Sequence, residues 1–157
     1  MKITLIAIGK TDDDYIIDGI NKYLNRIKHY IKFEIKIIPD LKKTKNLSQD
    51  EQKAKEAELF LKQINPTDEL IVLDERGVEL SSMHFADLLN KKMIGSVQNL
   101  VFLVGGPYGF DNLIYQRAHY KLSLSRMTFS HQMIRLFFTE QVYRAFTILK
   151  GEPYHHE

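Results

Sequence analysis

The amino-acid sequence predicts an α/β fold in which a mainly parallel sheet is covered by helices on both faces. Short apolar runs typical of buried strands alternate along the chain with longer segments of helical periodicity. This alternation favours a parallel sheet, because each crossover helix returns the chain to the same end of the sheet. The 157 residues contain no linker, internal repeat or low-complexity tract, so we expect a single domain over residues 1–157.

Five apolar runs predict the strands, and local end signals predict the helices. The expected strands are residues 2–8, 33–38, 69–73, 100–104 and 120–124. Ser48 with Glu51 has the pattern of a capping box, and residues 74–77 predict a turn. We expect a short helical piece at residues 112–117 and longer helices that begin at Thr11 or Asp12, at Ser48, at Ser81 or Ser82, and near Ser130.

The composition excludes several classes of protein. The chain has no cysteine, which excludes disulfides, thiolate nucleophiles and cysteine-based metal sites. Its six histidines are scattered without a metal-binding spacing, so we expect no metal site. No apolar run approaches the roughly 20 residues that span a bilayer, and the N-terminus does not resemble a signal peptide. We therefore expect a cytoplasmic protein that binds no membrane.

The net charge is only +2, but two segments of the chain are strongly basic. Residues 19–45 contain eight Lys or Arg side chains against two acidic ones, and residues 112–151 contain six against one. A basic segment is often only a solvated surface, and for residues 19–45 this interpretation stays open. The second segment overlaps the loops described next and contains arginines, which favour phosphate.

Two of the predicted strands end in loops that allow a ligand to approach the backbone. The loops are residues 105–109, with the sequence GGPYG, and residues 125–130. Ligands of open α/β sheets bind at the carboxyl ends of strands, so we expect one pocket built from both loops. The glycine loop lacks the spacing of a P-loop or a dinucleotide fingerprint. It indicates either a tight turn or a place where Gly105 lets a flat ligand lie against the backbone.

The second loop also has two interpretations. It is either an ordinary loop that leads to Ser130 as a helix cap, or a loop whose backbone N–H and C=O groups pair with an adenine-like edge. His131 and Arg135 follow it at a spacing of four residues near the start of the last helix, and this pair is most simply structural.

The final helix is apolar on more than one side. Phe138 and Val142 fall on one wide arc, whereas Leu136 and Tyr143 fall on a separate strip. A helix with this pattern packs on more than one side. The extra partner is either the rest of this fold or a second copy of the chain, and we favour a homodimer. The tail beyond the helix carries an imidazole, His155, and is either a frayed terminus or part of a site.

Four segments, in order along the whole chain, resemble a known family. They are KITLIAIGK at the N-terminus, FLVGGPYG at the glycine loop, LSLSRMTFSHQMIR after it, and EQVYRAF with a YH pair near the C-terminus. Each motif alone is weak, but all four in this order and at this chain length are highly specific. The chain resembles ribosomal RNA large subunit methyltransferase H, a family of small SPOUT-class enzymes.

The resemblance implies a SPOUT-type α/β fold with a C-terminal trefoil knot, in which the last helix passes through a loop. It implies a homodimer that binds S-adenosyl-L-methionine in the knot. It also implies transfer of methyl to N3 of a pseudouridine in helix 69 of 23S rRNA, within the assembled ribosome. The implied cofactor contacts are Leu73, Gly105, Leu124, Ser125, Arg126, Met127, Thr128 and Phe129.

The implied chemistry needs a group that takes the proton from N3, because the sulfonium methyl is already activated. His155 is a candidate general base, or orients one, a role that contributes about 10²–10⁴-fold. Arg144 and Arg135 are candidates for holding phosphate or stabilising the N3 anion. We expect tail and helix residues of one subunit to meet the cofactor of the other. Two alternatives are a SPOUT methyltransferase that acts on another RNA such as tRNA, and a non-catalytic ribosome-binding factor.

Overall fold

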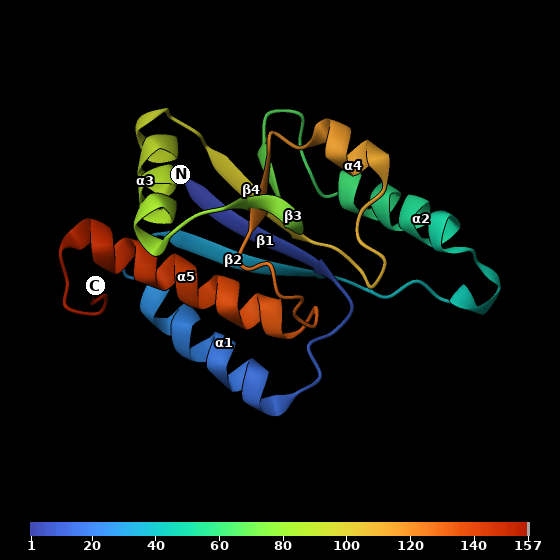
Figure 1. The fold of residues 1–157 in the computed structure, drawn as a ribbon, viewed down its shortest axis with the longest axis horizontal. Helices are drawn as coiled ribbons and strands as arrows, with labels where there is room; N and C mark the ends of the chain where they lie inside the picture. The colour runs from blue at the N-terminus through green and yellow to red at the C-terminus, as the bar shows by residue number, and fades with distance from the viewer. Residues whose placement is uncertain (157) are drawn as a thin grey trace.

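The structure is a computed structural model, shown in Figure 1. It describes residues 1–156. Glu157, the last residue of the predicted domain, lies outside the described residues. Its strands are β1 (Lys2–Ile8), β2 (Lys32–Ile38), β3 (Glu69–Glu79), β4 (Asn99–Val104) and β5 (Tyr120–Ser123). Its helices are α1 (Asp14–Ile27), α2 (Gln49–Leu61), α3 (Ser82–Ile94), α4 (Asn112–Arg117) and α5 (Met133–Lys150), with a 3₁₀ turn η1 (Thr44–Asn46). Every predicted strand and helix is therefore present.

The strands form one parallel sheet in the order β2-β1-β4-β3-β5, which confirms the predicted sheet. The residues of the central strands β1 and β4 are buried except for the first of each. A central parallel strand is covered on both faces, so it needs an almost continuous apolar sequence. The edge strand β2 instead carries Lys32, Glu34 and Lys36, and charges of this kind keep an open edge from pairing with another chain.

Helices cover both faces of the sheet, as the sequence predicts (Figure 1). On one face lie α1, α3 and α5, where the ring of Phe138 in α5 is centred 4.6 Å from that of Phe102 in β4. On the other face lie α2 and α4, where Phe60 and Ile114 join a second apolar cluster. The trefoil knot that the resemblance implies stays a prediction.

Both apolar sides of α5 have partners within the chain. The helix packs against the sheet and also against α1 and α3. Leu136, from the separate strip, lies so close to Gly19 of α1 that a Cβ on this glycine would come within 2.8 Å of Leu136 Cδ1. Tyr143, from the same strip, packs against the rings of Tyr23 and Tyr30. The rest of the fold therefore accounts for the strip, and the homodimer stays a prediction.

The helix starts are partly as predicted. The capping box at the start of α2 is confirmed, since Ser48 Oγ accepts from the Glu51 N–H and the Glu51 carboxylate accepts from the Ser48 N–H. Ser81 caps α3 through its side chain, which selects one of the two predicted positions. The predicted start of α1 at residues 11–12 is wrong, because the helix begins at Asp14 after Asp13.

The predicted turn at residues 74–77 is wrong, because β3 continues through it. The pairing of β3 with β5 is irregular there, since Leu73 and Val78 both pair with Leu122. A Cβ on Gly77 would lie 2.6 Å from the carbonyl carbon of Leu122, so glycine is required for this close approach. The polar residues 74–77 therefore lie at an irregularity in the pairing of β3 with β5 and not at the end of β3.

Arg135 in α5 is fully buried and joins this helix to the end of β1. Its guanidinium donates hydrogen bonds to the backbone carbonyl oxygens of Ile8 at 2.7 Å and Gly9 at 2.8 Å, and to Thr11 Oγ1 at 2.9 Å. Burial lowers the pKa of Arg135, and nearby carboxylates oppose this shift. The side chain therefore anchors the start of α5 to the chain that leaves the central strand.

We expect Arg135→Met to lower the free energy of unfolding by about 3 kcal/mol, because the substitution leaves two buried carbonyl groups without their donor. Urea denaturation measures this change. Arg126→Met is the matched control, since the Arg126 side chain is 90% exposed. The control should change the free energy of unfolding by less than about 0.5 kcal/mol. Equal effects of the two substitutions would contradict an anchoring role for Arg135.

Candidate functional site

A cavity of about 800 Å³ lies at the carboxyl ends of β4 and β5. Its walls are the ends of these two strands, the loops that follow them, and residues 73–76 in the irregular middle of β3. The two loops that the sequence singles out therefore meet in one pocket, because parallel strands end at the same edge of the sheet. Seven of the eight predicted cofactor contacts line it, namely Leu73, Gly105, Leu124, Ser125, Met127, Thr128 and Phe129.

The eighth predicted contact, Arg126, does not line the cavity. Its side chain is 90% exposed and its Nε lies 3.3 Å from a carboxylate oxygen of Glu79, at the end of β3. Side chains of neighbouring residues in an irregular loop point in different directions, so consecutive residues do not all face the cavity. The Arg126 side chain therefore lies at the surface in this structure, and its contact with the cofactor stays a prediction.

The loop after β5 is held in a curved shape by its own side chains. Ser123 Oγ donates to the carbonyl oxygen of Ser125 at 2.9 Å, and Ser125 Oγ accepts from the backbone N–H of Met127 at 2.9 Å. Thr128 Oγ1 donates to the Glu75 carboxylate at 2.8 Å, which ties the loop to β3. Short polar side chains that bond nearby backbone are typical of such turns. The loop thus presents its backbone to the cavity in a fixed conformation.

The glycine loop after β4 is a tight turn that also lines the cavity. The Gly109 N–H donates to the Gly106 carbonyl oxygen at 3.1 Å, and Gly109 has φ +79°, a conformation that favours glycine. A Cβ on Gly105 would lie 3.3 Å from the ring of Phe110. The contact that restricts position 105 is therefore with the protein's own core, while the loop as a whole forms a wall.

Two further cavity residues, Asp74 and Tyr115, form a hydrogen-bonded pair that the sequence does not reveal. Tyr115 Oη in α4 donates to the Asp74 carboxylate in β3. Burial and this hydrogen bond raise the pKa of Tyr115 to about 12. The family resemblance assigns Leu73 but not Asp74, the next residue, and no sequence signal points to Tyr115.

A smaller cavity of about 400 Å³ adjoins the first and shares part of its wall. The shared lining residues are Leu122, Ser123, Leu124 and Phe129. Beyond them, the wall includes Phe137, whose ring is centred 4.9 Å from that of Phe129, and the carboxylate-bearing Glu140. This second cavity combines apolar and aromatic walls with a few polar groups, as small-molecule sites do.

The candidate catalytic residues Arg144 and His155 lie together at the C-terminal end of α5. Arg144 donates from Nε and Nη2 to Glu140 Oε1 at 3.0 and 2.6 Å, and its Nη1 lies 3.3 Å from His155 Nδ1. Tyr154 Oη donates to the same Glu140 oxygen at 3.0 Å. Hydrogen bonding to Glu140 raises the pKa of Arg144, and burial together with hydrogen bonding to Tyr23 and Glu140 raises the pKa of Tyr154.

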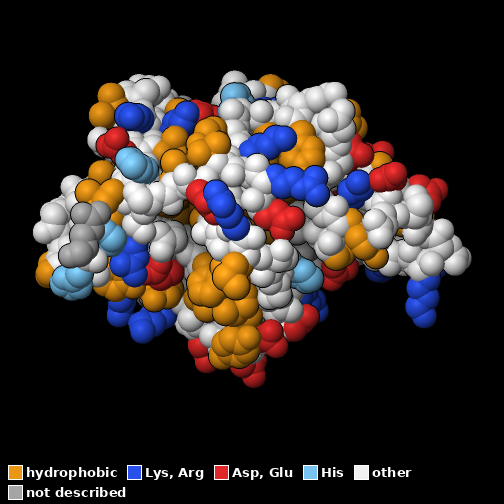
Figure 2. All heavy atoms as spheres, viewed as in Figure 1, with side chains coloured by type: hydrophobic (Ala, Val, Ile, Leu, Met, Phe, Trp, Pro, Cys, Tyr) orange, Lys and Arg blue, Asp and Glu red, His pale blue; other side chains and the backbone are white. Residues whose placement is uncertain are grey.

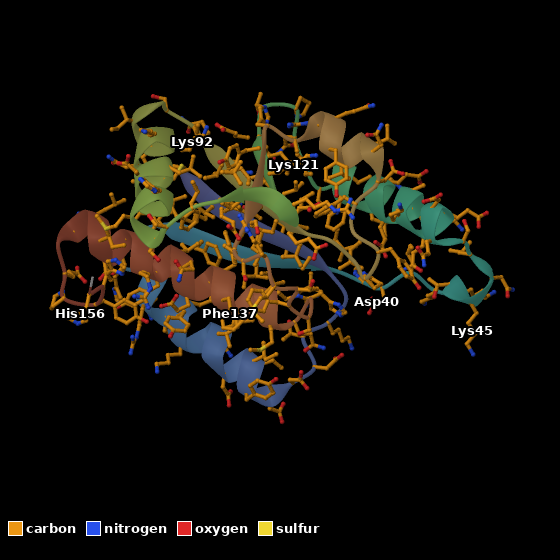
Figure 3. All side chains as sticks on the ribbon, viewed as in Figure 1. Asp40, Lys45, Lys92, Lys121, Phe137 and His156 are labelled. Carbon is orange, nitrogen blue, oxygen red and sulfur yellow. The ribbon has the colours of Figure 1, made fainter. Side chains whose placement is uncertain are left out.

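The structure does not bring this cluster to the larger cavity of the same chain. Ile134 lines that cavity and Arg144 lies ten residues later in α5, about 15 Å along a helix that rises 1.5 Å per residue. Figure 3 shows Phe137 along α5 and His156 beyond its far end. Arg135, the third candidate, is buried away from solvent and bonds to backbone, so in this structure it cannot contact phosphate or a base.

Two other sequence expectations concern metals and membranes. Across residues 1–156, no group of three or more His, Cys, Asp or Glu side chains is arranged to hold a metal ion. Within the same residues, no helix combines the length and apolar character needed to cross a bilayer.

Comparisons with known proteins define the class. A family model described as "Predicted SPOUT methyltransferase" matches residues 1–155. The solved structure of a probable methylase family protein from Haemophilus influenzae Rd KW20 has a TM-score of 0.51, covering 99% of this chain and 70% of that chain at 13% identity. At this identity the likeness shows the fold alone. The fold and the family model together make this chain a SPOUT-class methyltransferase.

The curated relatives narrow the class to one family. Ribosomal RNA large subunit methyltransferase H of Parabacteroides distasonis is 59% identical over 157 residues, covering all of both chains. The protein of the same name from Flavobacterium psychrophilum is 57% identical over the same span, and that from Bacteroides fragilis is 52% identical. This chain belongs to the ribosomal RNA large subunit methyltransferase H family, as its four motifs predict.

We expect the bond between Tyr115 and Asp74 to make stability depend on pH in the alkaline range. The folded-state pKa of Tyr115, about 12, lies above the ordinary value of 10.0, so its stabilisation is complete below pH 10 and is lost as the pH rises towards 12. The stability advantage of the wild type over Tyr115→Phe should shrink by about 1 kcal/mol between pH 8 and pH 11. Urea denaturation at both pH values measures it, and a constant difference would contradict the assignment.

Proposed function

We propose that this protein transfers a methyl group from S-adenosyl-L-methionine to N3 of a pseudouridine in helix 69 of 23S rRNA, in the assembled ribosome. The observation that carries this proposal is the full-length identity of 52–59% to proteins named ribosomal RNA large subunit methyltransferase H. The cavity also supports it, since seven residues that the family resemblance assigns to the cofactor line one cavity. A ribosomal substrate implies that the protein works in the cytoplasm.

The chemistry of the larger cavity fits this cofactor. Its volume of about 800 Å³ falls within the range of roughly 300–1,000 Å³ that small-molecule sites occupy. Leu73, Leu124 and Phe129 supply apolar contacts for an adenine ring, and the curved backbone between residues 124 and 129 supplies donors and acceptors for its edge. When bound, the cofactor supplies a methyl group that its sulfonium already activates.

The protein's own contribution to the reaction is to position the base and remove its imide proton. In the proposed mechanism His155 accepts the proton from N3, and its neighbour Arg144 stabilises the negative charge that develops on the base. Glu140 holds the Arg144 guanidinium through two hydrogen bonds, which fixes its direction. Arg135 has no catalytic part in this proposal, because it is buried and serves as an anchor.

A homodimer resolves the separation between the cavity and the C-terminal cluster. Arg144 lies about 15 Å along α5 from Ile134, which lines the larger cavity, and neither Arg144 nor His155 lines that cavity in its own chain. Phe137 lies between Ile134 and Arg144 in the helix and remains 37% exposed, on a face where hydrophobic side chains gather over α5 (Figure 2). We propose that this face contacts a second copy, and that the tail of one copy completes the cavity of the other.

Calorimetry and methyl transfer test the proposed function. The protein should bind S-adenosyl-L-methionine, and labelled cofactor should methylate a single nucleotide in assembled ribosomes, identified by mapping the modified RNA. Free 23S rRNA and tRNA are the parallel substrates. Methylation of tRNA instead of ribosomes would replace the proposal with a different RNA substrate. Failure to bind the cofactor at all would replace it with a non-catalytic ribosome-binding role.

We expect His155→Ala to reduce the rate of methyl transfer by about 10²–10⁴-fold, because the substitution removes the proposed proton acceptor. The affinity for S-adenosyl-L-methionine should stay within about twofold, since the proposed role of the imidazole is to accept the proton of the base and not to contact the cofactor. His29→Ala is the matched control, because His29 is an exposed histidine beyond the end of α1. A full rate for His155→Ala would rule out this role.

We expect a mixture of two inactive variants to regain activity if the active site is shared. One variant is His155→Ala, and the other is Leu124→Trp, whose indole would fill the cavity. After subunit exchange at equal concentrations, half of the dimers are mixed and each has one intact site, so about a quarter of the wild-type activity should return. Each variant mixed with itself is the control. No recovery after verified exchange would show that each subunit works alone.

A further inference from the structure

Glu56, in the middle of α2, is a buried carboxylate beneath the glycine loop. Its side chain belongs to a residue that is only 4% exposed, on the face of α2 that covers the sheet. A Cβ on Gly106 would lie 2.5 Å from Glu56 Oε2 and 2.8 Å from Oε1. The carboxylate is therefore pressed against the backbone of the loop, and glycine at position 106 is what allows this approach.

The loop rests on α2 at a second point, one helical turn further on. Phe60 follows Glu56 by four residues, so the two side chains lie on the same face of the helix. The ring of Phe60 is centred 5.9 Å from that of Phe110, which directly follows the glycine loop. Glu56 and Phe60 thus support the two ends of the loop from behind, while its front forms a wall of the larger cavity.

Burying the Glu56 carboxylate at this position costs desolvation free energy. Burial raises the pKa of Glu56, as does the nearby charge of Asp40, whereas a hydrogen bond from Gln52 Nε2 at 2.9 Å and the charge of His131 lower it. An apolar side chain would avoid the cost of desolvating an ionisable group. A buried ionisable residue that lowers stability is expected mainly at positions where it supports a functional site.

We propose that Glu56 is a positioning residue that sets the place of Gly106, and through it the shape of the cofactor cavity. This inference rests on the proposed function, because it takes the cavity to be the site for S-adenosyl-L-methionine. Gly106 accepts the hydrogen bond that closes the turn from Gly109, so a displacement of Gly106 moves the whole loop. Glu56 does not itself line the cavity, and its effect on the cofactor is indirect.

The first test compares cofactor affinity and turnover. Glu56→Ala should weaken S-adenosyl-L-methionine binding by about tenfold in calorimetry, while kcat at saturating cofactor stays within about threefold, because only the wall of the site is displaced. Glu56→Gln keeps the shape of the side chain and should retain affinity within about threefold. Glu58→Ala on the same helix is the matched control, since Glu58 is exposed, and it should change neither quantity.

The second test measures coupling between Glu56 and Gly106. Gly106→Ala should weaken cofactor binding more than Glu56→Ala does, because the new methyl group collides with the carboxylate. In the double variant the collision is gone, so binding should be no weaker than in Gly106→Ala alone. Effects that simply multiply in the double variant would overturn the inference, as would a Glu56→Ala protein that binds the cofactor like the wild type.

These outcomes separate the inference from the proposed function. If the wild-type protein does not bind S-adenosyl-L-methionine, the proposed function fails before any variant is compared. If the wild type binds and Glu56→Ala loses only thermal stability, with unchanged cofactor affinity, then Glu56 is a packing residue and the inference alone fails.

Discussion

The parallel alignment of three strands is the constraint on which the site depends. Because β3, β4 and β5 run in the same direction, the ends of β4 and β5 and the loops that leave them form a common cavity beside residues 73–76 of β3. The register fixes this edge, since Leu73 pairs with Val104 on one side and with Leu122 on the other. A slip of one residue would turn the wall residues to the other face of the sheet.

Much of this arrangement could be predicted from the sequence, because it depends on local patterns. The apolar run that forms β4 is buried throughout, and the capping box at Ser48 is a signal contained within four residues. Ligands of parallel sheets bind at the carboxyl ends of the strands, which predicts that the loops after β4 and β5 form one pocket. The family motifs then assign cofactor contacts to residues in these loops. Seven of the eight assigned residues line the cavity: Leu73 lies in β3, and the other six lie in short loops whose positions are fixed by the strands before them.

The errors and omissions come from contacts between distant parts of the chain. Arg135 donates to the carbonyl oxygen of a residue 127 positions earlier, and no periodicity indicates such a bond. Tyr115 reaches Asp74 across 41 positions. Arg126 shares a loop with cavity residues but points to solvent, because side-chain direction in an irregular loop depends on its tertiary contacts. The sequence does not predict that β3 continues through residues 74–77, because the polar residues there resemble a turn.

Helix α5 links these local and distant features. Its start is anchored in the core by Arg135, so the helix cannot slide relative to the strand ends. Its far end carries Arg144, which the Glu140 carboxylate holds in one direction. A rigid helix with one end fixed beside the cavity must hold its other end at a constant distance from it. Neither Arg144 nor His155 lines the larger cavity of its own chain, and this placement is the physical reason for proposing that the tail of one copy completes the cavity of another.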